Sequence, residues 1–307
     1  MRVVILPTGR TEWYGLPRAL ARLFPGHEFT PLPTELEILS NPEVFPAPGF
    51  TSYKLTARQR SAPPEDVMAL VERAAREAVG DRFSAAADLV LVLDDVEVYN
   101  RDNEAMVVAV AREAVLKHLS GLSYAVRDRT ANALRERVSF HLVRPMVEAW
   151  FFGDPGALRH AGVEPSYVLA SDPECFAVDD SAYLAADQAV CPSWIAAGRK
   201  RKSKPKWIDN ENRHLHPKGY IQWLTREASA KSCSRYSEKG HGAPALANLD
   251  WSAVLARPAA EFQYLRALVA DVADALNQAP ATGPISGIQA PLTSRFALPR
   301  DPVLRNL

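Results

Sequence analysis

The sequence predicts an α/β protein with a mostly parallel central sheet flanked by helices. Short apolar runs alternate with helical patterns along the first half of the chain, and this order of elements is typical of parallel strands joined by helices. The run over 89–93 is apolar at every position, as expected of a strand that is buried on both faces of a sheet. The second half has proline-rich stretches between helical patterns, so we expect a helical, loop-rich part packed on the core.

The N-terminal elements follow this order. Val3–Leu6 is a short apolar run that predicts the first strand, and residues 13–24 have a helical pattern. Gly9 allows a tight bend between the two elements, and Thr11 is suited to cap the helix. Residues 28–32 are expected to form a second strand.

Residues 31–64 are rich in proline and weakly periodic, and we interpret them as a long surface excursion. Apolar residues at helical spacing then predict a helix over 65–79, with Gly80 as its stop. The other elements expected in the first half are the buried strand 89–93, a helix with its apolar face at 107–116, a helix over 130–137 and an alternating strand over 138–143.

Helical patterns in the second half are shorter and lie further apart. We expect helices over 145–152, 154–159, 218–230 and 261–276, a weakly periodic stretch over 162–217 and a flexible polar loop over 236–242. Residues 280–307 show no period and predict a tail that packs on a partner. The expected division is a core over 1–160, an insertion and helical part over 161–277, and a tail over 278–307.

Composition narrows the class of protein. The 307 residues include 36 basic and 36 acidic side chains, so a nucleic-acid surface, if present, must be local. Three cysteines are few and far apart, which argues against a disulfide framework and favours a reducing, cytoplasmic setting. No apolar run approaches the ~20 residues that span a bilayer, so we expect no membrane partner.

Acidic residues crowd the end of the buried strand, at Asp94, Asp95 and Glu97. In an open α/β sheet, ligand sites lie beyond the carboxyl ends of the strands. Neighbouring carboxylates repel one another unless they share a cation or a proton, and a hard divalent cation such as Mg²⁺ or Mn²⁺ suits oxygen ligands. The alternative is a solvated acidic turn after a core strand.

Glu148 is the one charged residue in the apolar segment 146–152. An unpaired carboxylate is unfavourable in such a setting. Glu148 is therefore expected either to pair with an arginine such as Arg144 or to reach the same cation as Asp94, and perturbed carboxylates concentrate in functional sites.

A basic run lies inside the weakly periodic stretch of an otherwise neutral chain. It comprises Arg199, Lys200, Arg201, Lys202, Lys204 and Lys206, and Trp207 follows it. Such a run is typical of binding to a phosphate backbone. The alternative is a solvated charged loop, which is the usual role of a charge run.

Five segments together resemble a known family: Gly9–Glu12 (GRTE), Leu93–Glu97 (LDDVE), Arg144–Asp154 (RPMVEAWFFGD), His216–Lys218 (HPK) and Tyr236–Gly242 (YSEKGHG). They resemble the Toprim-related RloB-like and OLD-nuclease-like proteins, which include relatives encoded beside ATPases in bacterial anti-phage defence loci. The similarity covers most of residues 1 to about 257, with a large insertion at 163–213, and the Glu-Ala-Trp segment is its most specific part.

The resemblance implies a Toprim-like Rossmannoid core and a magnesium-dependent nuclease acting on DNA or RNA. It implies an SMC/ABC-type or OLD-type ATPase as partner. Carried onto this sequence, it makes Glu12 and Glu148 candidate catalytic acids, and Asp94, Asp95 and Glu97 candidate ligands of Mg²⁺ or Mn²⁺. Lys218, Lys239 and His241 become candidate phosphate contacts.

Two positions depart from the family pattern. The family has Glu-Gly directly after the first strand, where this chain has Thr8-Gly9, and Glu12 is the neighbouring acid. The Asp-x-Asp of the later strand is here Asp95-x-Glu97. Three hypotheses follow: an active nuclease with a rearranged acid set, a catalytically degraded Toprim-like binding subunit, or a nucleotide-binding α/β protein with its phosphates on 8–11.

Overall fold

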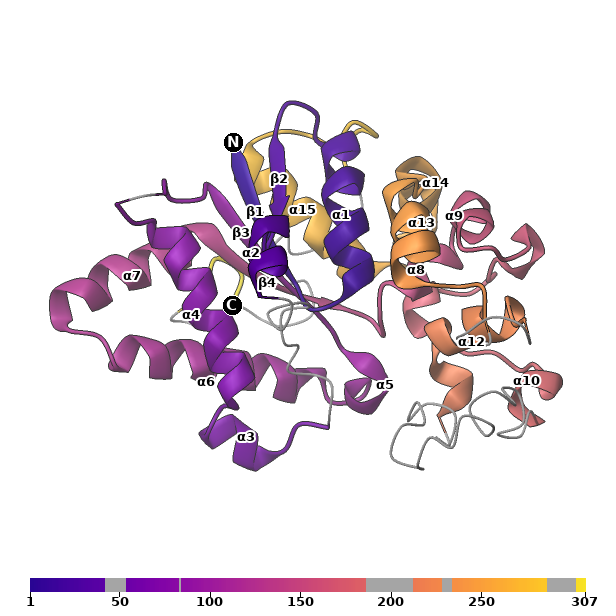
Figure 1. Ribbon diagram of the computed structural model, residues 1–307, viewed down its shortest axis with the longest axis horizontal. Helices are drawn as coiled ribbons and strands as arrows, with labels where there is room; N and C mark the ends of the chain where they lie inside the picture. The colour runs from indigo at the N-terminus through magenta and orange to yellow at the C-terminus, as the bar shows by residue number, and fades with distance from the viewer. Residues whose placement is uncertain (42–53, 83, 186–211, 228–233, 286–301) are drawn as a thin grey trace.

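A four-stranded, all-parallel sheet lies at the centre of the computed structural model, which describes residues 1–307 except 42–53, 83, 186–211, 228–233 and 286–301 (Figure 1). The order in the sheet is β2-β1-β3-β4. The strands are β1 (Arg2–Pro7), β2 (Glu28–Pro31), β3 (Leu89–Asp95) and β4 (Val138–Val143). This confirms the α/β class and the four strands expected from the sequence.

Helices cover both faces of the sheet (Figure 1). On one face lie α1 (Arg10–Leu23) and α15 (Gln263–Leu276), and on the other lie α4 (Glu65–Val79), α6 (Glu104–Ser120) and α7 (Tyr124–Arg137). Side chains of the strands alternate between the two layers, as the period of a strand requires. Val3 and Ile5 of β1 belong to the core on the α1 side, and Val4 and Leu6 to the core on the α4 side.

The predicted helix over 65–79 is confirmed at both ends. Two helices begin earlier than predicted: α1 begins at Arg10, and α7 begins at Tyr124. The helix predicted over 261–276 begins two residues later, at Gln263. The surface excursion contains two short helices with capping boxes, α2 (Glu35–Ser40) and α3 (Ala57–Ser61). Six or fewer residues give too weak a periodic pattern to stand out from a proline-rich background.

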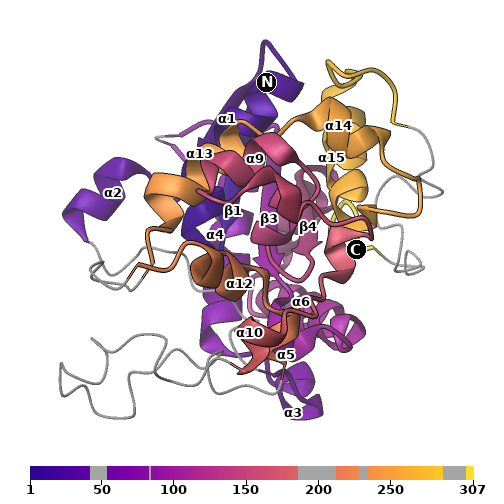
Figure 2. The same cartoon turned by 90° about the vertical axis from the view of Figure 1, so that its right-hand side faces the viewer.

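The second half is built of short helices gathered at the ends of the strands (Figure 2). They are α8 (Glu148–Phe151), α9 (Pro155–His160), α10 (Ser181–Ala185), α12 (Pro217–Leu224), α13 (Ala243–Ala247) and α14 (Trp251–Ala256), with 3-10 turns at Pro165–Tyr167, Pro173–Cys175 and Arg213–Leu215. One short helix of the first half, α5 (Glu97–Asn100), also lies at the ends of the strands. Helix α5 follows β3 directly.

Several predictions for this half differ from the structure. The predicted helix over 145–152 is limited to α8, Glu148–Phe151. The predicted helix over 218–230 ends at Leu224, and the hydroxyl of Thr225, the next residue, bonds to Ile221 O and Ser234 Oγ. Residues 236–242 are not a flexible loop, since Glu238–Gly242 form the π-helical turn η8. Ser237 begins that turn by accepting a hydrogen bond from Gly240 N.

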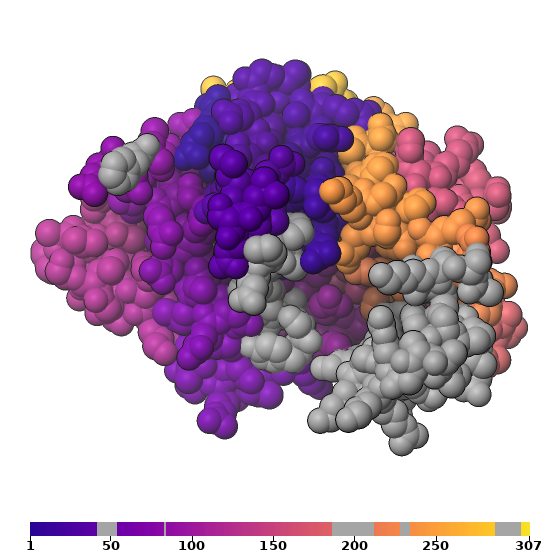
Figure 3. Space-filling model, in the orientation of Figure 1, coloured from indigo at the N-terminus to yellow at the C-terminus, as the bar shows by residue number. Residues whose placement is uncertain are grey.

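The first helix of the chain lies against the C-terminal part (Figures 1 and 3). A side chain at Gly15 of α1 would place its Cβ 2.8 Å from Ala243 O and 2.9 Å from Leu246 Cβ, both in α13. The absence of a side chain at this position therefore permits the close crossing of α1 and α13. This contact places η8, which precedes α13, beside the start of α1.

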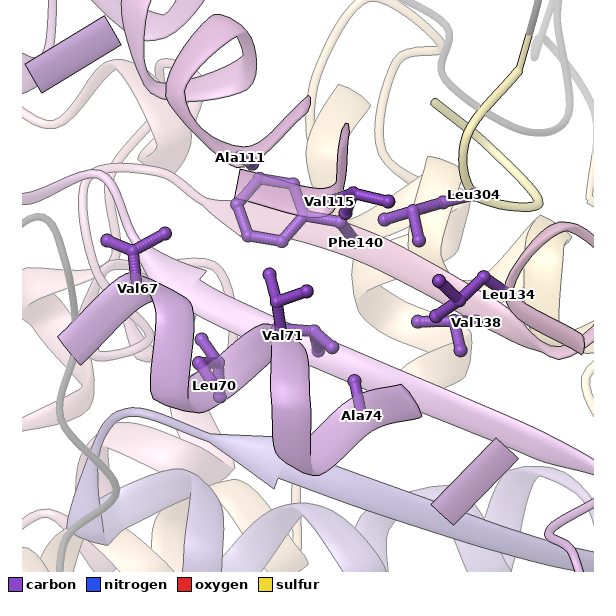
Figure 4. Close-up of a pocket in the computed structure, with 11 residues that line it drawn as sticks. Val67, Leu70, Val71, Ala74, Ala111, Val115, Leu134, Val138, Phe140 and Leu304 are labelled. Atoms are coloured by element: carbon purple, nitrogen blue, oxygen red, sulfur yellow. The ribbon is translucent and has the colours of Figure 1, made fainter. Parts of the chain in front are cut away.

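The described end of the chain packs on the chain's own sheet, where the sequence had predicted contact with a partner. Val303, Leu304 and Leu307 are buried in the core on the α4 side. Leu304 helps to line an apolar cavity between α4, α6, α7 and β4 (Figure 4). Among the described residues, no helix has both the length and the apolar character needed to cross a membrane.

Candidate functional site

The strongest candidate site lies where the parallel strands β1, β3 and β4 end. Strand β3 finishes in Asp94 and Asp95, and Glu97 lies two positions after Asp95. Glu97 has a φ of +57°, a left-handed conformation that is uncommon for a residue with a side chain. Its N–H donates to Pro145 O at 2.8 Å, which joins the loops that follow β3 and β4.

Glu12 reaches this edge from the first turn of α1. A Cβ at Gly9 would lie 2.1 Å from Glu12 Oε2, so the carboxylate folds back over the glycine. Gly9 has an ordinary φ of −113°, so its backbone conformation does not require a glycine. Its missing side chain instead leaves room for the Glu12 carboxylate. The sequence had assigned Gly9 to a tight bend. Burial, followed by the charge of Glu148, raises the pKa of Glu12 to about 8.

Glu148, at the start of α8, is also buried. Its Oε1 accepts hydrogen bonds from the Tyr236 hydroxyl at 2.9 Å and the Thr11 hydroxyl at 3.2 Å. Pairing with Arg144 is not observed, because the Arg144 guanidinium bonds to Glu104 at 3.0 Å. Burial raises the pKa of Glu148, although Lys218 acts in the opposite direction.

Lys218 is a cation among these acids. It lies in the first turn of α12, which begins where His216 Nδ1 accepts a hydrogen bond from Gly219 N at 3.0 Å. The Lys218 ammonium pairs with Glu238 of η8. Burial alone would lower the pKa of Lys218, but Glu148, Glu238 and Glu97 together raise it.

Four of the five predicted acids are brought together. Burial and the charges of Glu12, Glu97 and Glu148 raise the pKa of Asp95 well above its usual value. Burial raises the pKa of Glu97 to about 7. The charge of Lys218 lowers this pKa, and the charge of Glu148 raises it further. We call Glu12, Asp95, Glu97, Glu148 and Glu238, with Lys218, the acidic cluster.

Asp94, the fifth predicted acid, is held next to the cluster. It is buried, and its Oδ1 accepts a hydrogen bond from the Thr8 hydroxyl at 2.8 Å. Thr8 follows β1, and its N–H donates to Leu93 O at 3.2 Å, so this contact ties the ends of β1 and β3 together. Asp94 thus anchors the rim of the site.

Several residues of the site were not found from the sequence, namely Thr8, Thr11, Tyr236 and Glu238. Thr11 was assigned to capping, but its side chain bonds to Glu148 and makes no cap hydrogen bond. Glu238 was passed over in favour of Lys239 and His241 beside it. Nothing in the sequence distinguishes these three charged neighbours, because the turn of η8 decides which one faces the acids.

The two other predicted phosphate contacts on η8 lie outside the acidic cluster. Lys239 is exposed, and its ammonium lies 5.0 Å from the ring centre of Tyr14. His241 is half-buried, and its Nδ1 lies 3.4 Å from Ser237 Oγ. The basic residues Arg199, Lys200, Arg201, Lys202, Lys204 and Lys206 fall outside the described residues.

The cluster suits a hard cation by the chemistry of its donors. Within the described ranges, no group of three or more His, Cys, Asp or Glu side chains is already arranged to hold a metal ion. The cluster nevertheless offers carboxylate oxygens, which Mg²⁺ and Mn²⁺ prefer. Its buried acids already attract a positive charge, the ammonium of Lys218. In the metal-free protein the Lys218 ammonium therefore compensates part of the acidic charge that a divalent metal ion would otherwise compensate.

Comparison of the chain with known protein families, with curated proteins and with solved structures finds no match in any of the three.

Proposed function

We propose that this protein is a Toprim-related nuclease that cleaves phosphodiester bonds of DNA or RNA with Mg²⁺ or Mn²⁺. We further propose that it works beside an ATPase in bacterial anti-phage defence. One observation carries the proposal: five carboxylates from four separate segments interact with one another at the carboxyl ends of a parallel sheet, and three of them, Glu97, Glu148 and Glu238, act on the Lys218 ammonium. Carboxylates gathered at this edge of an α/β fold suit a ligand site better than a structural role.

The position of Glu12 supports the link to the Toprim pattern. That pattern has a glutamate directly after the first strand, where this chain has Thr8. Because the Glu12 carboxylate folds back over Gly9, it occupies space beside the turn after β1. Glu12 lies about one helical turn further along the chain than the glutamate of the Toprim pattern, and its carboxylate can therefore replace the carboxylate of that missing residue.

Glu12, Asp95, Glu97 and Glu148 would hold the metal. A bound divalent cation would neutralise the scissile phosphate and make a bound water more acidic. Lys218 would bind a phosphate oxygen, since its pKa is raised and it carries a charge throughout the neutral range. Glu12 would bind the metal as a carboxylate, so metal binding would release the proton that its raised pKa of about 8 holds in the metal-free protein.

A degraded binding subunit is the second candidate. The ion pair between Lys218 and Glu238 already compensates part of the acidic charge. The lack of a metal-ready group among the described side chains also favours this candidate. In that case the protein would bind nucleic acid or the ATPase without cleaving the nucleic acid.

Nucleotide binding at 8–11 is disfavoured. The hydroxyls of Thr8 and Thr11 already bond to Asp94 and Glu148. The Glu12 carboxylate covers Gly9 at the start of α1, where a phosphate would have to lie. A phosphate would have to displace the Glu12 side chain from that place.

A cleavage assay tests the proposal. Fluorescent single-stranded and double-stranded DNA and RNA are incubated with the protein in Mg²⁺ or Mn²⁺, with and without an ATPase encoded beside it. We expect the parent to cleave the nucleic acid and Asp95→Asn to lose this cleavage. Asp128→Asn is the matched control, because Asp128 lies exposed on α7, away from the cluster. Cleavage that survives in Asp95→Asn would contradict the assignment, and binding without cleavage would favour the degraded subunit.

A further inference from the structure

Two hydroxyls converge on one oxygen of Glu148. The Tyr236 phenol donates to Glu148 Oε1 at 2.9 Å, and the Thr11 hydroxyl donates to the same atom at 3.2 Å. The three side chains come from separate elements: Glu148 from α8, Thr11 from α1, and Tyr236 from the segment before η8. We call Tyr236 and Thr11 the hydroxyl clamp.

The clamp is rigidly built. Tyr236 and Thr11 are 2% and 1% exposed, so neither hydroxyl exchanges freely with water. Tyr236 N donates to Ser234 Oγ at 3.0 Å, and Ser234 Oγ bonds to Thr225 Oγ1 at 2.7 Å. A chain of buried hydrogen bonds therefore fixes the backbone from which the phenol projects.

Gly242 closes the clamp from the side of η8. A Cβ at this position would lie 2.5 Å from the Tyr236 hydroxyl and 2.9 Å from Thr11 Oγ1. The absence of a side chain at Gly242 therefore leaves room for both hydroxyls beside Glu148. The same turn carries Glu238, the partner of Lys218.

Donors to a carboxylate do two things at a metal site. They fix the orientation of the carboxylate, and they leave its other oxygen to face a cation. Both hydroxyls bond to Oε1 of Glu148, so they act on one oxygen of this carboxylate. We infer that Tyr236 and Thr11 are positioning residues that hold Glu148 as a ligand for the divalent cation, an inference that rests on the proposed function.

Mn²⁺ binding tests the clamp without reference to cleavage. The dissociation constant is measured by electron paramagnetic resonance for the parent, Tyr236→Phe, Thr11→Val and Thr11→Ser. Each of the first two substitutions removes one donor and keeps the size of the side chain. Loss of one such donor typically weakens metal binding 10–100-fold, and we expect about this loss. Thr11→Ser retains a hydroxyl and should bind Mn²⁺ nearly as the parent does.

Tyr183→Phe is the matched control. Tyr183 is also 2% exposed, and its hydroxyl donates to Arg213 O at 3.1 Å, away from the acids. Its loss should leave Mn²⁺ affinity unchanged. If Tyr183→Phe and Tyr236→Phe weakened Mn²⁺ binding equally, the loss would be a general effect of removing a buried phenol, and the role of the clamp would be overturned.

A second measurement covers unfolding. Urea midpoints without metal are compared for Tyr236→Phe, Glu148→Gln and the double variant. Contact between the two side chains makes the effects non-additive, and additive midpoints would overturn the clamp. If the parent binds Mn²⁺ and Tyr236→Phe binds it equally, the clamp fails and the proposed function stands. If the parent binds no Mn²⁺, the proposed function fails, and with it the role of the clamp at a metal.

Discussion

Glu12 shows most plainly how burial changes a side chain in this site. Its pKa of about 8 means that in the metal-free protein the carboxyl carries a proton at neutral pH. In the unfolded chain it would be ionised above its ordinary pKa of 4.5. The folded state therefore binds a proton that the unfolded state releases between these two pH values. Over that range, stability falls as the pH rises.

This shift predicts the pH dependence of unfolding. Each pKa unit corresponds to roughly 1.4 kcal/mol, so without metal Glu12 should lower the free energy of unfolding by about 3 kcal/mol between pH 5.5 and 8.5. Glu12→Gln should remove the part of the pH dependence that Glu12 contributes in urea unfolding, while Asp95, Glu97 and Glu148, whose pKa values are also raised, leave a remaining slope. Glu72→Gln, exposed on α4, is the control. An equal slope in Glu12→Gln and the parent would contradict the assignment.

Some residues of the site could be predicted from the sequence and others could not. Asp95 and Glu97 were predicted because acids after a buried apolar run occupy a known position in α/β folds. Glu148 stood out as a charge in an apolar segment. Tyr236 and Glu238 carry no such mark, because their roles depend on contacts made in the folded chain: Tyr236 bonds to Glu148, 88 positions earlier, and Glu238 pairs with Lys218, 20 positions earlier.

At the scale of elements, the crossing of α1 and α13 positions the site. It holds η8 beside the first turn of α1, so that Glu238 and Tyr236 face Glu12, Thr11 and Glu148. Regular patterns predicted the long helices such as α4. They did not predict η8, because a five-residue π-helical turn has no recurring pattern and its polar sequence resembles a loop.

The close crossing of α1 and α13 predicts that alanine destabilises the protein at Gly15, whereas alanine at Gly121, outside the crossing, should hardly change its stability. Gly15→Ala places a Cβ 2.8 Å from the α13 backbone and should destabilise the protein by about 1–3 kcal/mol through overpacking. Gly121→Ala has no atom closer than 3.5 Å and should change stability by less than about 0.5 kcal/mol. Urea unfolding measures both changes. A Gly15→Ala variant as stable as the parent would show that the two helices are free to separate.

At the scale of the whole molecule, the C-terminal segment closes one edge of the sheet. Asn306 accepts a hydrogen bond from Phe140 N at 2.9 Å and donates one to Phe140 O at 2.8 Å, so its side chain takes the place of a neighbouring strand. Arg305 bonds to Asp271, which also receives His141 Nε2 of β4 at 2.9 Å. Burial acts to raise the pKa of Asp271, but these partners lower it overall.

The sequence suggested a tail for a partner because it has no period there. A short apolar segment that packs against a sheet edge without forming a helix or strand needs no periodic pattern in its sequence. The sequence does not reveal its contacts, because they join residues more than 150 positions apart, such as Phe140 and Asn306.

This edge predicts a stability effect. Asn306→Ala leaves the buried N–H and C=O of Phe140 without their partner and should cost about 2–4 kcal/mol of unfolding free energy. Asn132→Ala, exposed on α7, removes only a contact with Arg135 at 3.3 Å and should be nearly neutral. Equal stability of the two variants in urea would mean that the C-terminal segment does not hold the sheet.

The central claim is that the acidic cluster binds a divalent cation. Titration of the metal-free parent with Mn²⁺ at pH 8, followed by electron paramagnetic resonance, tests it most directly. The account predicts saturable binding that is lost in Asp95→Asn and kept in Asp128→Asn. Absence of saturable binding in the parent, or equal binding in Asp95→Asn, would contradict it.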